Sequence, residues 1–328
     1  PLLARDITAA LAGNGPTLGF GEVSSEFGPS QAAVVIGTSG TTGAPKEIFL
    51  SSNALVASAR ASNAFVGAKL GDTWSLLLPL THVAAVNVFV RAFELGTIPV
   101  DLRNHSGEYP RVNFTAIVPT QLFRALNGDD QLLKHLQGAQ KVLVGGAALS
   151  NAIRNQATAA GINVVTTYGM SETSGGCVYN GEILEGTEVE VRGGSIFIRG
   201  NILALNLDLS DGWFETNDLG EFVDEKLVVI GRSDDVIISG GENLSLNSVE
   251  SILNESFPGT QCAAFSVDDP QWGQTLHIAF VGQADREAIA TVLESKIGTF
   301  AKPKGIHFVN SLPLLGIGKV DRKRLAQE

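Results

Sequence analysis

Short apolar runs alternate with stretches of helical spacing through the first half of the chain. Runs such as Ala32–Ile36 and Val142–Val144 have the length of buried strands, whereas Asn87–Leu95 and Asn151–Ala160 have a helical pattern. This alternation is typical of βαβ units and predicts a mostly parallel sheet flanked by helices. The expected strands are Ala32–Ile36, Glu47–Leu50, Trp74–Leu78, Ile98–Val100, Ala116–Val118, Val142–Val144 and Val164–Thr167, and the expected helices are Ile7–Leu11, Ser51–Val66, Asn87–Leu95, Gln121–Leu126 and Asn151–Ala160.

The pattern changes twice in the second half. After Gly175, short alternating segments predict an antiparallel, small β-barrel-like region, and from Ser233 strands and helices form a compact α+β unit. The turn-rich, charged stretch Gly231–Asp235 separates these parts. We therefore expect an α/β fold with a large N-terminal domain (residues 1–231) and a small C-terminal α+β domain (residues 232–328). The segments behind this prediction are Glu188–Arg192, Ser195–Arg199, Glu221–Val223 and Leu227–Ile230, then Val236–Ser239, Leu246–Phe257, Ala263–Val267, Thr275–Val281, Asp285–Ile297 and Gly305–Phe308.

Composition supports a globular protein. The 328 residues are 44% hydrophobic and 17% charged, with a net charge of −11. An acidic balance argues against nucleic acid or an anionic membrane as the main partner. Two cysteines are too few for a disulfide framework, and the N-terminal residues have no basic, apolar signal pattern. No apolar run approaches the ~18 residues of a membrane span, so we expect a cytoplasmic protein.

The stretch Gly37–Lys46, GTSGTTGAPK, follows an apolar strand. Its first seven residues are three Gly, one Ser and three Thr, which can turn several backbone N–H groups inward and add hydroxyl donors, and a lysine ends it. These are the groups that bind a polyphosphate. The pattern is not a Walker A loop, because Lys46 follows Gly43 by three residues and precedes Glu47. The alternative is a flexible surface loop.

Further motifs follow in order along the chain: VGGA (Val144–Ala147), YGMSET (Tyr168–Thr173), WFETND (Trp213–Asp218), GRSDDVIISGGEN (Gly231–Asn243) and PLLGIGKVDR (Pro313–Arg322). Each alone could be an ordinary turn or terminal segment. Together with the Gly-rich stretch they resemble the ordered motifs of the adenylate-forming enzymes, which include acyl- and aryl-CoA ligases, luciferases and peptide-synthetase adenylation domains. The resemblance implies ATP and Mg²⁺ as ligands and a small domain that rotates.

The resemblance assigns most motif residues to ATP. Tyr168 stacks on adenine, Asp218 binds the ribose hydroxyls, Glu172 holds Mg²⁺, and Lys319 is the lysine of adenylation. Carboxylate and phosphate oxygens are normal ligands of a hard cation. Thr42, Glu172 and Lys319 are implied as catalytic. The complete implied ATP set is Thr38, Ser39, Gly40, Thr41, Thr42, Gly43, Lys46, Gly145, Gly146, Tyr168, Gly169, Met170, Ser171, Asp218, Arg232 and Lys319.

The chain departs from the family pattern at two positions. Ser171 replaces the more common Thr, and Asn217 replaces a Gly next to Asp218. By resemblance, Asp234 is the hinge of the small domain, and Gly240 and Gly241 lie on a loop that enters the coenzyme A tunnel after rotation. The sequence SGGEN there is more typical of CoA ligases than of peptide-synthetase domains.

Two further segments bear on the acid substrate. PLTHVAA (Pro79–Ala85) resembles a ligase motif whose histidine, here His82, stands between the acyl and CoA sites and acts in catalysis. AIVPTQLFRAL (Ala116–Leu126) resembles a segment of o-succinylbenzoate–CoA ligases of menaquinone synthesis, and the short chain suits their compact forms. We expect the acid pocket near His82, Arg103, Thr120, Arg124, Thr167 and Ser174–Cys177, with Arg124 or Arg103 as a second cation for a dianionic acid.

The expected activity is therefore an ATP-dependent acid–CoA ligase with 2-succinylbenzoate as the acid, ATP, Mg²⁺ and coenzyme A as cofactors or co-substrates, and no nucleic-acid or membrane partner. Alternatives are a short ligase for another carboxylic acid and a non-catalytic relative that binds a nucleotide or acyl-adenylate. Members of the family often form homodimers, and the sequence does not decide the oligomeric state.

Overall fold

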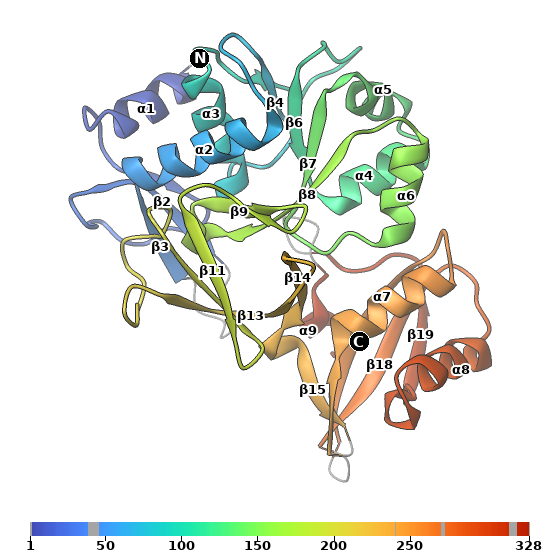
Figure 1. The fold of residues 1–328 in the computed structure, drawn as a ribbon. Coiled ribbons are helices and arrows are strands. Elements are labelled where there is room, and N and C mark those ends of the chain that lie inside the picture. Colours follow the sequence, from blue (N-terminus) through green and yellow to red (C-terminus); the bar gives the residue numbers. More distant parts are fainter. Residues whose placement is uncertain (1, 39–45, 240, 270–272, 315–319, 328) are drawn as a thin grey trace.

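A computed structural model describes residues 2–38, 46–239, 241–269, 273–314 and 320–327. Figure 1 shows two parts: a large one with three sheets, and a small one below it with one sheet. No helix in these ranges is long and apolar enough to cross a membrane.

The largest sheet has seven strands in the order β10-β9-β8-β7-β6-β4-β5, and its centre is parallel. Alternate residues of its strands face opposite layers: Leu143 packs against helices α2 and α3, whereas Val142 and Val144 pack against α4, α5 and α6. Burial on both faces explains the continuous apolar runs of these strands. The bounds are β4 Trp74–Leu76, β5 Val100–Asp101, β6 Phe114–Ile117, β7 Lys141–Val144, β8 Val164–Met170, β9 Gly175–Tyr179, β10 Glu182–Ile183, α2 Ser52–Val66, α3 Val83–Glu94, α4 Pro119–Leu126, α5 Asp130–Gly138 and α6 Asn151–Ala159.

Two smaller sheets complete the large part. Helix α1 (Leu2–Leu11) covers the sheet of β1 (Leu18–Phe20), β2 (Ala32–Thr38) and β3 (Lys46–Ser51), in which β2 and β3 are antiparallel. The other is an antiparallel sheet in the order β11-β12-β13-β14. This sheet is the expected barrel-like region, and its bounds are β11 Thr187–Arg192, β12 Ser195–Gly200, β13 Phe214–Val223 and β14 Lys226–Arg232.

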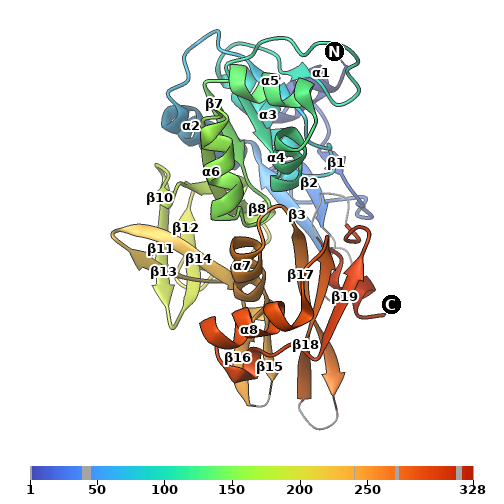
Figure 2. The same ribbon diagram turned by 90° about the vertical axis from the view of Figure 1, so that its right-hand side faces the viewer.

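The small part begins directly after β14. The turn η2 (Ser233–Asp235) leads into a five-stranded sheet with its own apolar core. The change of sheet falls within the stretch that the sequence analysis takes as the junction. Figure 2 shows α7 and α8 on one face of this sheet and the C-terminal segment on the other. The bounds are β15 Val236–Ser239, β16 Glu242–Ser245, α7 Leu246–Ser256, β17 Gln261–Asp269, β18 Gly273–Val281, α8 Arg286–Lys296, η3 Thr299–Ala301, β19 Gly305–Val309 and α9 Arg322–Leu325.

The sequence pattern missed some elements. Helix α5 was not expected, although Asp129 caps it and Leu132 and Leu136 share its buried face, because polar residues dominate the segment. The short strand β1 was also not expected. Strand β8 continues through Met170 because β9 pairs with it antiparallel, a contact that no local pattern indicates.

Candidate active site

The carboxyl ends of four neighbouring parallel strands carry the predicted motifs. Ile117 of β6 pairs with Val144 of β7, and Val144 pairs with Thr166 of β8. The segments after these pairs contain Thr120, the Gly145–Gly146 pair and Tyr168, and the segment after β4 leads to His82 at the start of α3. In open α/β sheets this edge is where ligands bind.

The Gly-rich stretch joins two antiparallel strands at the same side of the molecule. Thr38, at the end of β2, pairs with Lys46, at the start of β3, and the Thr38 hydroxyl donates to the Lys46 carbonyl at 3.0 Å. The Lys46 ammonium lies 3.7 Å from Oε1 of Glu172. The stretch is therefore closed at its base next to the predicted metal ligand. The other predicted phosphate residues, Ser39, Gly40, Thr41, Thr42 and Gly43, lie outside the described residues.

A segment that the sequence analysis did not single out holds Glu172 and β3 together. The backbone N–H of Ala204 donates to the Glu172 carbonyl at 2.9 Å. Two residues on, the Asn206 side chain donates to the Glu47 carbonyl at 2.8 Å and accepts from the Phe49 N–H at 3.0 Å. The Asn206 side chain thus pairs with the backbone of β3 in the way that a neighbouring strand would. The only sequence feature that could have indicated the contact between Asn206 and β3 is the presence of an asparagine in a mainly apolar stretch.

Tyr168, Asp218 and Arg232 form a second connected group. The Tyr168 hydroxyl donates to Asp218 at 2.8 Å, and Arg232 lies 3.7 Å from the other carboxylate oxygen. Asp218 and Arg232 face each other across β13 and β14. Burial, and then the Asp218 charge, raise the pKa of the Tyr168 hydroxyl, so the hydroxyl remains a donor at neutral pH. Three residues that the resemblance assigns to ATP binding are therefore brought together.

Phe214–Asp218 of the WFETND segment lie in β13, at a place where the pairing with β12 shifts register. The Thr216 hydroxyl donates to the Ile196 carbonyl at 2.9 Å and accepts from the Asp218 N–H at 3.1 Å, which fixes the carboxylate within the strand. Asn217 lies in the same strand and is not among the residues with positive φ. The strand thus accommodates Asn217 without the conformational freedom of a glycine.

Glycine at position 145 is explained by its neighbour on β8. A Cβ at this position would lie 2.1 Å from the Thr167 hydroxyl oxygen, so a side chain is excluded unless Thr167 moves. Gly146 has φ +84°, a conformation that favours glycine. At Gly169 an added Cβ would meet the Gly175 carbonyl at 2.1 Å, because β8 and β9 approach closely there.

The turn between β8 and β9 is fixed from α3. Ser174 has φ 51°, and its carbonyl accepts from the buried Asn87 amide at 2.6 Å. The Ser174 hydroxyl donates to the Ile202 carbonyl at 2.7 Å. Ser174 is buried, so its hydroxyl is already used inside the protein. Asn87, which fixes this turn, was not identified from the sequence.

The two arginines proposed for the acid pocket take part in surface ion pairs. Arg124 lies 3.0 Å from Asp129, with a side chain 59% exposed, and Arg103 makes a two-pronged contact with Asp101. Among the residues that the structure describes, neither makes a hydrogen bond or ion pair with the groups described above.

A different arginine is buried nearby. Arg91 of α3 is 4% exposed, stacks over the Trp74 ring at 5.0 Å, and donates to the Tyr179 hydroxyl at 3.1 Å. Tyr179 pairs with the predicted substrate residue Thr167 across β8 and β9. Among the described residues no carboxylate pairs with Arg91, and its Nε atom has no hydrogen-bond partner. A buried cation without an anion is costly, and the burial of Arg91 was not predicted from the sequence.

The donor set fits a magnesium ion only in the presence of substrate phosphates. The described residues contain no cluster of three or more potential metal-ligating side chains. Glu172 offers one carboxylate with a side chain 19% exposed, next to the base of the Gly-rich stretch. Mg²⁺ is commonly bound by one or two carboxylates together with substrate phosphate oxygens, so Glu172 fits this role.

The remaining predicted residues lie at or beyond the junction. Asp234 is in η2, and the Ser233 hydroxyl donates to the Asn217 carbonyl at 3.2 Å. Gly241 follows β15 in a hairpin at the end of the small part farthest from the large sheet (Figure 1). Gly240 and Lys319 lie outside the described residues.

Comparisons with known proteins show the family to which the chain belongs. The model of the AMP-binding enzyme family matches residues 7–199, and that of the AMP-binding enzyme C-terminal domain matches residues 248–319. The chain therefore belongs to the AMP-binding, adenylate-forming enzymes, and within them to the AMP-forming acid–CoA ligases.

Several similar proteins are named as 2-succinylbenzoate–CoA ligases. A Mycobacterium tuberculosis protein named "Probable 2-succinylbenzoate–CoA ligase" is 37% identical over 90% of this chain and 84% of its own length. The 2-succinylbenzoate–CoA ligase of Lactococcus lactis is 27% identical over 92% of this chain and 72% of its own. The o-succinylbenzoate CoA synthetase (MenE) of Bacillus subtilis, solved with the acyl-adenylate OSB-AMP, shares the fold with a TM-score of 0.76 at 24% identity, over 90% of this chain and 69% of that one.

Proposed function

We propose that this protein is a 2-succinylbenzoate–CoA ligase of menaquinone biosynthesis, which forms an acyl-adenylate and then a coenzyme A thioester. The observation that carries the proposal is the convergence of Lys46 and Glu172, and of Tyr168, Asp218 and Arg232, at one edge of the sheets. The identity of 37% to a relative named for this activity supports the choice of acid.

In the first step, a carboxylate oxygen of the acid attacks the α-phosphorus of ATP, and pyrophosphate leaves. Tyr168 and Asp218 hold the nucleoside, while Lys46 and the hydroxyls of the Gly-rich stretch bind phosphate oxygens. Mg²⁺, when bound at Glu172, neutralises charge on those oxygens. Lys319 stabilises charge on the reacting groups. Catalysis of this kind depends on positioning and electrostatic stabilisation rather than on a protein nucleophile.

In the second step, the small domain turns about Asp234 and brings the Gly240–Gly241 turn toward the large domain. The coenzyme A thiol, having lost its proton, attacks the acyl carbonyl carbon, and AMP leaves with the electron pair of the broken bond. His82, which precedes α3, has the role of separating the acyl and thiol sites in this proposal. The products are the thioester and AMP.

Arg91 supplies the second cation for a dianionic acid. Of the two carboxylates of 2-succinylbenzoate, one reacts with ATP and the other needs a charged partner. Arg103 and Arg124 are already paired at the surface, whereas Arg91 is buried beside Tyr179 and lacks a carboxylate among the described residues. Charge-assisted hydrogen bonds to the unreactive carboxylate would satisfy this buried cation.

The test of the function is turnover across a panel of carboxylic acids with ATP, Mg²⁺ and coenzyme A, in which AMP and the thioester are measured by mass spectrometry. We expect the highest kcat/KM for 2-succinylbenzoate. Turnover of another acid with none of 2-succinylbenzoate would overturn the substrate assignment. Nucleotide binding with no pyrophosphate release from any acid would indicate a non-catalytic relative.

The role of Arg91 is tested with Arg91→Met. Loss of a charge-assisted hydrogen bond should raise KM for 2-succinylbenzoate by about 10- to 100-fold. The control is 3-benzoylpropionate, the same acid without the ring carboxylate, whose kinetics should change little. If both acids lose activity equally, Arg91 supports the fold and does not select the acid.

A further inference from the structure

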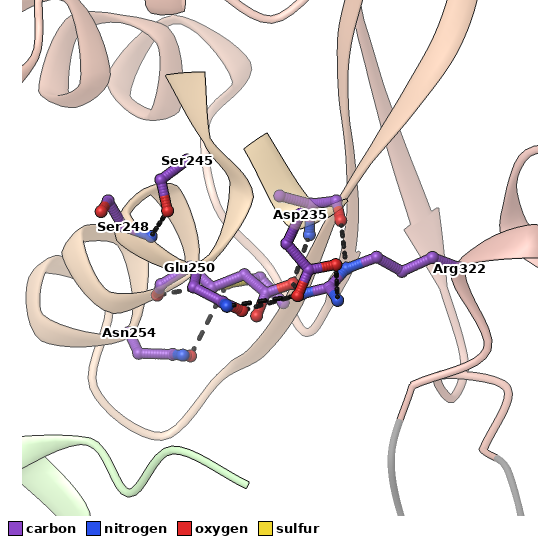
Figure 3. A network of polar contacts seen from close by, with 9 residues as sticks. Asp235, Ser245, Ser248, Glu250, Asn254 and Arg322 are labelled. Atoms are coloured by element: carbon purple, nitrogen blue, oxygen red, sulfur yellow. Dashed lines mark hydrogen bonds and ion pairs between the residues drawn. The ribbon is translucent and has the colours of Figure 1, made fainter. Parts of the chain in front are cut away.

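One arginine connects four elements of the small domain. Figure 3 shows Arg322, at the start of α9, among polar groups from η2, α7 and β17. Its guanidinium donates to Asp235 at 3.0 Å, to Glu250 at 2.9 Å, and to the Ala264 carbonyl at 2.9 Å. It also donates to the Asn247 side chain at 3.0 Å, and Asn247 in turn donates to Asp235 at 3.3 Å. The planar guanidinium is suited to such a fork of simultaneous contacts.

The contacts are largely shielded from water. The side chains of Asp235 and Glu250 are each 19% exposed, and that of Arg322 is 26% exposed. Burial raises the pKa of the Glu250 carboxyl, and the Arg322 charge opposes that rise. Glu250 also accepts from the Ala264 N–H at 2.9 Å, so its carboxylate joins α7 to β17 and, through Arg322, to α9. If Arg322 were removed, the neighbouring, partly buried carboxylates of Asp235 and Glu250 would lose the positive charge that lies between them.

The partners of Arg322 lie at functionally different places. Asp235 ends the turn η2, directly after the predicted hinge residue Asp234. Arg322 itself is three residues after Lys319 in the sequence. Helix α9 has only four residues, too few to be stable without tertiary contacts. Its other contacts include Leu325, packed against Ala263 and Phe265, and a hydrogen bond from the Asp321 N–H to the Pro313 carbonyl at 2.8 Å.

We propose that Arg322 is a positioning residue for the adenylation step: its contacts with Asp235 and Glu250 fix the segment that follows Lys319 to the hinge and to α7. The lysine-bearing segment and the hinge turn then move as one unit when the small domain rotates. This inference rests on the proposed function, because it assigns Lys319 to adenylation and the Gly240–Gly241 turn to thioester formation.

The kinetic test measures the two half-reactions separately in Arg322→Ala and in Arg322→Lys. The lysine variant keeps the positive charge but lacks the planar guanidinium that donates to several groups at once. We expect acid-dependent ATP–pyrophosphate exchange to fall roughly 10²-fold in Arg322→Ala, the cost of misplacing a catalytic group by about 1 Å. Arg322→Lys should lie between this variant and wild type. Thioester formation from preformed acyl-adenylate should stay close to wild type, and since it needs the same small domain, it also reports folding.

A matched control is Arg286→Ala. Arg286 is in the same domain, donates to the Ile306 carbonyl of β19 at 2.5 Å, and stacks on Phe308 at 5.1 Å. Within the described part of the chain it makes no hydrogen bond or ion pair with η2 or α9. Its loss should change both half-reactions by the same factor. A parallel fall of both half-reactions in Arg322→Ala, or unchanged pyrophosphate exchange, overturns the positioning role.

A second measurement does not depend on activity. Hydrogen–deuterium exchange should become faster for the amides of Asp321, Arg324 and Leu325 in Arg322→Ala, with β18 unchanged, because these amides hold the segment. The same amides should be unaffected in Arg286→Ala. If hydrogen–deuterium exchange is unchanged in Arg322→Ala, the inference about Arg322 is wrong, whatever reaction the enzyme catalyses. If exchange becomes faster but the wild-type protein activates no acid, only the proposed function is wrong.

Discussion

At the scale of single residues, hydrogen bonds keep the carboxyl group of Glu47, which follows the Gly-rich stretch, in its charged form. A hydrogen bond from the Ser25 side chain, followed by the backbone N–H groups of Ser24 and Ser25, lowers the pKa of the Glu47 carboxyl from 4.5 to about 2. Because the folded pKa lies below the unfolded one, this stabilisation is complete above pH 4.5 and is lost as the pH falls toward 2. The carboxylate thus holds the Ser24–Ser25 segment against β3 at neutral pH.

We expect Glu47→Gln to reduce the fall in the free energy of unfolding between about pH 5 and pH 3, since the variant has no carboxyl to titrate at this position. Urea unfolding at a series of pH values measures the change. Glu26→Gln is the control, because the described residues give Glu26 no hydrogen-bond partner. An NMR titration that places the Glu47 pKa near 4.5 would contradict the prediction.

At the scale of secondary-structure elements, the close approach of β7 and β8 at the site requires a glycine. In Gly145→Ala the new Cβ would meet the Thr167 hydroxyl oxygen at 2.1 Å. We expect a loss of about 1–3 kcal/mol in the free energy of unfolding, the usual cost of overpacking. Adding Thr167→Ala removes the hydroxyl and should restore much of this loss.

Urea unfolding of both single variants and the double variant gives their coupling energy. Gly138→Ala is a matched control, because nothing lies within 4 Å of the position of its Cβ. Strictly additive effects of Gly145→Ala and Thr167→Ala would show that the contact does not limit this position.

At the scale of the whole molecule, the two domains touch through α6 and α7, where Asn151 donates to Glu255 at 3.3 Å. In this arrangement the β15–β16 hairpin, with Gly241, points away from the large sheet (Figures 1 and 2). The proposed second step requires that hairpin to approach the large domain. Under the proposed mechanism, the arrangement seen here is therefore not the one that forms the thioester.

Joining Asn151→Cys to Glu255→Cys with a short bismaleimide should abolish thioester formation from preformed acyl-adenylate. The native cysteines, Cys177 and Cys262, are buried and free, so the single-cysteine variants treated in the same way are the controls. Rapid thioester formation by the fully crosslinked protein would contradict domain rotation.

Most of the chemistry in the proposed site could be predicted from short stretches of sequence. Each short motif contains both the functional residue and the neighbouring strand pattern that predicts its position. The residues found in this way are Lys46, Glu172, Tyr168, Asp218 and Arg232. The same holds for the parallel sheet, because hydrophobic periodicity acts over a few positions.

The sequence by itself therefore determined the kinds of groups at the site, their order and the two-part fold. Only the tertiary structure decided which groups are buried and paired: Arg91 is buried without a carboxylate among the described residues, whereas Arg103 and Arg124 are paired at the surface. Asn206 reaches β3 across 157 positions, and Arg322 reaches Asp235 across 87. Burial and long-range pairing depend on the packing of whole elements, so no local pattern contains them.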